Sequence, residues 1–182
     1  KAKRISAPKN FDVRPTTDFA KEALFSILAN RYDVEFCSVL DLFAGIGSIT
    51  LELASRDCQD ITAVEMNPKH AAFINSTASE LEMALQINVQ RGDVFEWLKK
   101  NRTKKLYDIV FADPPFELEE KKYNELISLV LNNEFLKENG TFVLEHQSKM
   151  KLEHPNLTET RKYGNVSFSF FSSEMRVPSS EV

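Results

Sequence analysis

Apolar positions along the chain form two alternating patterns, short continuous runs and longer helical repeats. The continuous runs predict strands over residues 38–43, 60–64, 87–90, 109–112 and 141–145. Between them, apolar residues recur every three or four positions, which predicts helices over 18–31, 49–55, 68–81 and 123–131 and one carrying Trp97 and Leu98. Strands that alternate with helices favour an α/β fold with a buried parallel sheet.

The pattern changes after Pro155. Residues 158–163, a Gly164-Asn165 pair, and then Val166, Phe168 and Phe170 alternating with serines predict a closing antiparallel hairpin. Two connections are less regular: residues 135–140 predict a helix end and turn before the fifth strand, and the charged residues 117–122 predict a mobile lid.

The fourth apolar run stops at Asp113-Pro114-Pro115-Phe116. Proline has no N–H for a sheet ladder, so the strand ends there. Asp113 and the Pro114 carbonyl are acceptors for the two N–H groups of an amine on a flat ring, and Phe116 offers a stacking face. The same tetrapeptide also occurs as a simple turn or helix cap, so the motif alone leaves both interpretations open.

The first strand, which contains Asp41, leads through Gly45 and Gly47 into a helix. Glycines in such a turn allow a close approach of a ligand to the backbone and leave the amides of the helix start available. A dinucleotide fingerprint has a third glycine where this chain has Thr50, so the signal for NAD is only partial.

Acidic residues also follow the next two strands. Glu65 ends the second strand about 20 residues after the glycine turn, a position suited to the hydroxyls of a ribose. Asp93 follows the third strand, where it is both a helix cap and an acceptor for an adenine amine.

Composition is that of a single soluble domain, with 182 residues of which 42% are hydrophobic and 27% charged. No apolar stretch approaches the roughly 20 residues that cross a bilayer, and the amino end lacks a secretory signal, so we expect a cytoplasmic protein. The chain starts at Lys1 without a methionine, and we expect a few residues upstream of it.

Charge is unevenly distributed, although the formal net charge is −4. Five basic side chains against Asp12 give the first fourteen residues a charge of +4 and leave −8 on the remainder. A basic arm of this kind can follow a phosphate backbone, with Arg4, Lys9 and Arg14 as contacts, or it is a solvated tail. The basic residues of 99–105 allow a second phosphate contact, but a solvated turn is the simpler interpretation.

Metal and redox chemistry have little support in the sequence. Cys37 and Cys58 are too few and too far apart for a zinc motif or a redox pair, so we interpret them as reduced packing residues. The three histidines, His70, His146 and His154, have no ligand spacing.

Taken together, the strands, the acids at their ends and the hairpin resemble the Rossmann-like methyltransferase fold. Its seven-stranded sheet has the order 3-2-1-4-5-7-6, with strand seven antiparallel and helices on both faces. A more specific resemblance, to the RsmD family, covers nearly the whole chain. It is carried by Val13-Arg14-Pro15-Thr16-Thr17-Asp18, by Asp41-Leu42-Phe43-Ala44-Gly45-Ile46-Gly47, by Glu65-Met66-Asn67 and by Asp113-Pro114-Pro115-Phe116. Phe19-Ala20 departs from the family, which tends to have an arginine there.

Enzymes of that family methylate the exocyclic N2 amine of a guanine in bacterial small-subunit ribosomal RNA, with S-adenosylmethionine as cofactor. The resemblance implies the same reaction here, on RNA that is either free or part of an assembling small ribosomal subunit, without a metal or a membrane. It also implies a basic arm over residues 1–17, a methyltransferase domain over 18–175 and a flexible tail over 176–182.

The resemblance further implies a role for each motif residue. The methionine end of the cofactor lies over Asp41, Phe43, Gly45 and Gly47, its ribose on Glu65, and its adenine near Met66, Asp93 and Val94. Asp113 and the Pro114 carbonyl hold the guanine amine, and Phe116 stacks on the base.

Three alternatives remain open. Asp113 accepts equally well from an adenine amine, which allows N6 methylation of adenine in DNA or RNA. The partial glycine fingerprint with Glu65 allows an NAD-dependent oxidoreductase. A relative that binds RNA without catalysis is the third.

Overall fold

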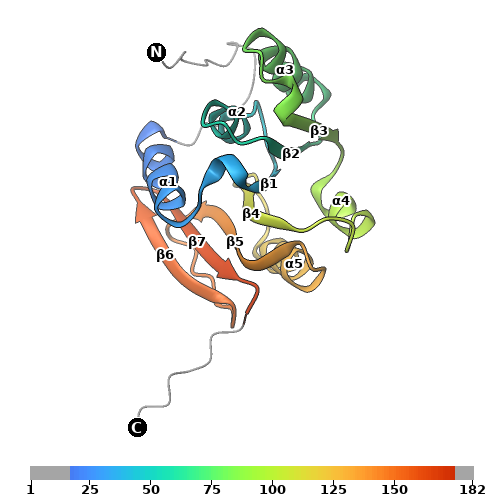
Figure 1. Cartoon of the computed structure of the whole chain (residues 1–182). Coiled ribbons are helices and arrows are strands. Elements are labelled where there is room, and N and C mark those ends of the chain that lie inside the picture. The colour runs from blue at the N-terminus through green and yellow to red at the C-terminus, as the bar shows by residue number, and fades with distance from the viewer. Residues whose placement is uncertain (1–16, 175–182) are drawn as a thin grey trace.

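One seven-stranded sheet organises residues 17–174, the part of the chain that the computed structural model describes (Figure 1). In chain order the elements are α1 (Asp18–Arg31), the 3-10 helix η1 (Val34–Phe36), β1 (Ser38–Leu42), α2 (Ser48–Ser55), β2 (Asp60–Glu65), α3 (Pro68–Glu80), the 3-10 helix η2 (Ala84–Gln86), β3 (Ile87–Arg91), α4 (Val94–Lys100), β4 (Tyr107–Ala112), α5 (Glu120–Asn132), β5 (Leu136–Gln147), β6 (Leu157–Tyr163) and β7 (Val166–Ser172). The predicted arm, its residues Arg4, Lys9 and Arg14, and the predicted tail lie outside the described residues.

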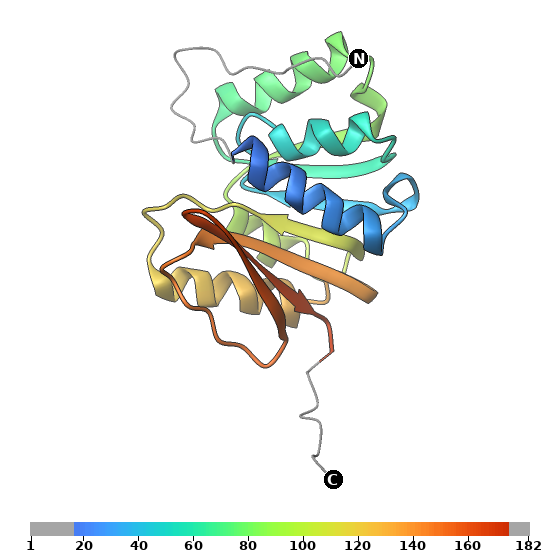
Figure 2. The ribbon, with the colours of Figure 1, turned by 90° about the vertical axis from the view of Figure 1, so that its left-hand side faces the viewer.

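The strand order is β3-β2-β1-β4-β5-β7-β6, as the family resemblance implies. β1 to β5 pair in parallel, and β7 pairs antiparallel with β5 and with β6. The β6–β7 hairpin therefore forms one end of the sheet (Figure 2). The predicted fold is confirmed.

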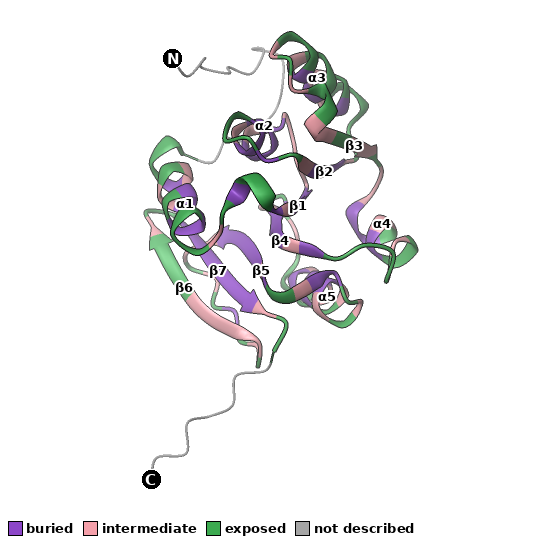
Figure 3. Cartoon of the chain, viewed as in Figure 1, coloured by how far each residue is buried: buried purple, intermediate pink, exposed green. Residues whose placement is uncertain are grey.

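Helices cover both faces of the sheet because the strands alternate between two apolar clusters. Val39, Ile109 and Phe111 belong to the cluster that contains α1 and α2, whereas Leu40 and Val110 belong to the cluster that contains α4 and α5. The central strands are buried on both sides, and the edge strands β3 and β6 are more exposed (Figure 3). Within residues 17–174, no helix is long and apolar enough to cross a membrane.

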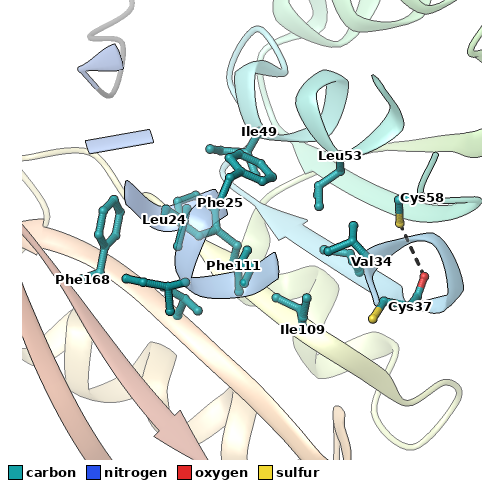
Figure 4. Packing of buried hydrophobic residues seen from close by; sticks show 14 of the residues in the cluster. Leu24, Phe25, Val34, Cys37, Ile49, Leu53, Cys58, Ile109, Phe111 and Phe168 are labelled. Carbon is teal, nitrogen blue, oxygen red and sulfur yellow. Dashed lines mark hydrogen bonds between the residues drawn. The ribbon is translucent and has the colours of Figure 1, made fainter. Parts of the chain in front are cut away.

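Packing under α1 includes both cysteines, which are buried and unpaired as predicted (Figure 4). The Cys58 thiol donates to the Cys37 carbonyl over 3.5 Å. Burial, the largest cause, raises the pKa of Cys37 to about 11, so the group stays a neutral thiol near pH 7. The two cysteines are therefore part of the core.

The start of the fifth strand differs from its prediction. Residues 135–140 are not a helix end and turn, because Leu136 already pairs with Tyr107. Pairing then shifts, and Thr141 is the partner of Ile109. The residues between form a bulge in which Asn139 has a φ of 63°. The predicted start of this strand at residue 141 was thus wrong, and the predicted turn is a bulge within the strand.

The segment 117–122, predicted as a mobile lid, is helical in its second half. Glu120 begins α5, so residues 120–122 are its first turn. The connection before it is short and is closed by a hydrogen bond from Leu118 N to the Pro115 carbonyl, 3.0 Å long.

The serines of the predicted hairpin are buried, like the apolar residues they alternate with. Ser169 is 0% exposed because β7 lies inside the sheet, between β5 and β6. Its hydroxyl lies 2.7 Å from His146 Nε2 and 2.9 Å from Thr160 Oγ1. His146 Nδ1 lies 2.9 Å from the Gln147 carbonyl, which only accepts, so Nδ1 carries the proton and Nε2 accepts from Ser169.

We predict that Ser169→Ala destabilises the protein by about 1–3 kcal/mol, because it leaves His146 Nε2 buried without a donor. Ser172→Ala is the matched control, since within residues 17–174 the Ser172 hydroxyl donates only to the exposed Glu174 carbonyl. Urea unfolding of both variants measures the difference, and equal losses would contradict this account.

Candidate active site

The carboxyl ends of β1 to β4 meet along one rim of the sheet. Backbone hydrogen bonds continue past the strand ends into the loops, from Ala44 N to Val64 O (3.1 Å), Gly92 N to Glu65 O (3.1 Å) and Asp113 N to Leu42 O (3.4 Å). Because these bonds join neighbouring strands, the loops that carry the predicted site residues are fixed side by side. The order of the strands reverses between β1 and β4, where doubly wound sheets bind their ligands.

The turn after β1 is shaped by three residues with positive φ, Phe43 (57°), Gly45 (59°) and Gly47 (86°). A Cβ on Gly47 would lie 2.8 Å from Ile74 Cγ1, so the close packing of α3 requires this glycine. A Cβ on Gly45 would meet no atom within 4 Å. Of the two predicted ligand-facing glycines, Gly45 is therefore the one beside open space.

Glu65 connects the end of β2 to this turn. One carboxylate oxygen accepts from Gly45 N at 2.6 Å and the other from Asn67 N at 3.0 Å. Each oxygen of a carboxylate has two acceptor sites, so both keep one for another donor. Glu65, the predicted ribose acceptor, and Gly45, which borders open space, thus lie next to each other on the rim.

Asp41 lies within β1, one residue before the strand ends at Leu42. Its side chain is almost fully buried and accepts from the Thr50 hydroxyl on α2 at 2.6 Å. Burial, the largest cause, raises the pKa of Asp41 to about 7, and the charge of Glu65 adds to the rise. The Asp41 carboxyl therefore stabilises α2 beneath the glycine turn, and Thr50 is the partner that sequence reasoning missed.

We predict that the stability difference between Asp41→Asn and the wild type depends on pH. Between an unfolded pKa of about 3.9 and the raised folded pKa, the folded wild type holds a proton that the unfolded chain has lost, so its stability falls as pH rises through this window. Asparagine does not titrate, so the variant should gain on the order of 2 kcal/mol relative to the wild type from pH 5 to pH 8. Urea unfolding at both pH values measures the gain, and a pH-independent difference would refute it.

The predicted adenine contacts lie at the ends of β2 and β3. Met66 is 63% exposed, a large apolar side chain left on the surface. Asp93 caps α4 as predicted, accepting from Glu96 N at 3.0 Å. Val94 is buried in the apolar cluster below α4, so its side chain belongs to the core.

The Asp113-Pro114-Pro115-Phe116 loop follows β4. It lies on the other side of the switch point, the place between β1 and β4 where the strand order reverses. Asp113 and Phe116 are half-buried and Pro114 is buried. Phe116 packs against the α1 cluster and also lines a pocket of about 380 Å³. The rest of this pocket comes from residues 147–149, Lys162, Gly164 and Asn165, none of which had been predicted as site residues.

Comparison with known proteins supports the family suggested by the motifs. A family model described as "Conserved hypothetical protein 95" matches residues 1–172. The chain is 30% identical over 176 residues to ribosomal RNA small subunit methyltransferase D of Buchnera aphidicola subsp. Baizongia pistaciae, covering 94% of this chain and 87% of that protein. The chain belongs to the RsmD family.

Solved structures agree with this membership. The Escherichia coli protein yhhF has a TM-score of 0.76 and 27% identity, covering 90% of this chain and 89% of that one. A T. thermophilus 16S rRNA N2 methyltransferase, in complex with AdoMet and guanosine, has a TM-score of 0.69. At 24% identity, over 88% of this chain and 44% of that one, the second likeness shows the fold alone.

In this RsmD-family member, the basic residues of 99–105 lie away from the rim. The Lys105 ammonium pairs with Asp60, the first residue of β2, at 2.6 Å. Lys99 pairs with Glu96 and with Glu125. These contacts place the cluster toward the amino ends of the strands and favour the solvated turn over a second phosphate contact.

Proposed function

We propose that this chain transfers a methyl group from S-adenosylmethionine to the exocyclic N2 amine of a guanine in small-subunit ribosomal RNA. The observation that carries the proposal is the hydrogen bond from Asp113 N to Leu42 O, 3.4 Å long. It fixes the amine-binding loop directly beside the strand that leads into the glycine turn. A donor of methyl groups and an acceptor amine can therefore meet at the switch point.

The cofactor is S-adenosylmethionine, and the rim from β1 to β3 fits its parts. Gly45 borders open space, and Glu65 keeps acceptor capacity for ribose hydroxyls. Met66 supplies an exposed apolar surface for the adenine, and Asp93 an acceptor for its amine. Asp41 contributes indirectly, through Thr50 and the start of α2.

On the substrate side, the amine of guanine needs acceptors because its lone pair is delocalised into the ring. Asp113 and the Pro114 carbonyl take the two N–H bonds and so localise the lone pair, while Phe116 stacks on the base. S-adenosylmethionine supplies a methyl group already activated by its sulfonium. Holding the nitrogen in line with that methyl provides much of the rate, and the Asp113 carboxylate takes up the proton that the amine loses.

The target base must leave its helix or loop to reach such a pocket, at a cost of a few kcal/mol. Stacking on Phe116 and contacts with the RNA backbone offset that cost. Arg4, Lys9 and Arg14 remain proposed backbone contacts. The RNA is either free or part of an assembling small subunit.

Mass mapping of small-subunit RNA from cells with and without this protein tests the proposal. We expect one N2-methylguanosine to disappear without the protein and to return when purified protein and S-adenosylmethionine are added. Loss of N6-methyladenosine instead would select the adenine alternative. An unchanged RNA, together with calorimetric binding of NAD in place of S-adenosylmethionine, would overturn the proposal.

We predict that Asp113→Asn lowers the rate of methyl transfer roughly 100-fold or more while S-adenosylmethionine still binds. The amide keeps the shape of the side chain but loses one acceptor oxygen and the capacity to take up a proton. Asp57→Asn, at an exposed position after α2, is the matched control and should leave the rate unchanged. Single-turnover methylation and calorimetry measure the two effects, and a full rate in Asp113→Asn would exclude the role.

A further inference from the structure

The pocket beside Phe116 lies on the same rim as the candidate active site. β5 runs parallel to β4, so its last residue, Gln147, reaches that rim, and Gln147 pairs with Val166, the first residue of the antiparallel β7. β6 ends beside it at Tyr163. The hairpin turn at Gly164 and Asn165 is therefore at the carboxyl edge of the sheet, and only β5 lies between β7 and the strand β4 that precedes the Asp113 loop.

The wall of this pocket is held in place by hydrogen bonds centred on Ser148. Its N–H donates to the Asn165 carbonyl at 2.9 Å, and its hydroxyl donates to the Gly164 carbonyl at 3.0 Å. The Ser167 hydroxyl donates in turn to Ser148 Oγ at 3.0 Å. Ser148 thus joins the end of β5 to the β6–β7 turn, two segments far apart in the sequence, and together they form one preformed surface.

Two cations, Lys149 and Lys162, line this surface, and no acidic residue of the described range 17–174 does. Both lysines are exposed, and neither forms an ion pair with a carboxylate of residues 17–174. Some other lysines in that range are paired, as Lys105 is with Asp60 and Lys137 is with Asp108. On a chain of net charge −4, a concave site with two uncompensated cations attracts anions selectively.

We infer that this pocket binds the RNA backbone next to the target guanine, with Lys149 and Lys162 contacting its phosphate groups. The inference rests on the proposed function, and it names where the substrate strand lies. Phe116 belongs both to the pocket and to the base-stacking site, so a ligand in one continues into the other. A volume of about 380 Å³ suits a nucleotide-sized group, and Gln147 and Asn165 add amides that donate and accept.

The double variant Lys149→Ala with Lys162→Ala tests this assignment in the full-length protein. We expect RNA affinity to fall about tenfold at low salt and the slope of log affinity against log salt to decrease by about 1–2, as expected for the loss of two phosphate contacts. The KM for RNA should rise, while calorimetric affinity for S-adenosylmethionine stays unchanged. The matched control is Lys100→Ala with Lys104→Ala, which removes the same charge from the α4–β4 region and should leave RNA binding unchanged.

A second double variant, Lys149→Arg with Lys162→Arg, separates charge from folding, because it keeps the cations and should retain both affinity and salt slope. If the wild type methylates RNA and the alanine variant keeps its affinity and slope, this inference fails while the proposed function stands. If the wild type neither binds nor methylates small-subunit RNA, the proposed function fails and the inference fails with it.

Discussion

The arrangement of the site depends on backbone hydrogen bonds that extend the sheet beyond its strands. Each bond, such as the one from Gly92 N to Glu65 O, contributes only about 0.5–1.5 kcal/mol to stability. Their main effect is positional, since they hold the first residue of each loop at the spacing of neighbouring strands. The backbone positions of Glu65, Asp93 and Asp113 are therefore fixed, although these residues lie at or beyond the ends of their strands. A parallel sheet provides this positioning because all of its carboxyl ends share one edge.

The reversal of strand order divides the rim into two halves with different chemistry. On the β1 to β3 side, the open backbone at Gly45 and the acceptors of Glu65 suit a neutral or cationic nucleoside. On the β5 to β6 side, Lys149 and Lys162 suit a polyanion. Asp113 lies at the border between them, where a group carried by one ligand can pass to the other. The proposed RNA-binding surface is therefore confined to one half of the rim of an acidic chain.

Predictions from the sequence were correct where a local structure, such as a helix cap or a strand end, is determined by one short segment. The cap at Asp93 and the stop after β4 depend on residues within three or four positions, and both are found as predicted. They failed where partners come from distant segments. Thr50 is nine residues from Asp41, on another element, and no local pattern links them. Lys149 and Lys162 are brought together only by the antiparallel return of β7, which the alternation of Val166 and Phe168 predicts without fixing its register.

The pair of Asp41 and Thr50 also bears on the oxidoreductase alternative. In a dinucleotide-binding fold, the third glycine allows the helix to pack closely against the strand. Here the same position carries a side chain that is 0% exposed and donates its hydroxyl to a buried carboxyl at 2.6 Å. Removal of that hydroxyl would cost a desolvated carboxyl its side-chain donor, so this turn depends on the Asp41–Thr50 pair rather than on a close approach of the helix to the strand. Thr50, which stands where the fingerprint has its third glycine, is thus part of the packing of this turn, and it counts against the interpretation of the turn as a dinucleotide site.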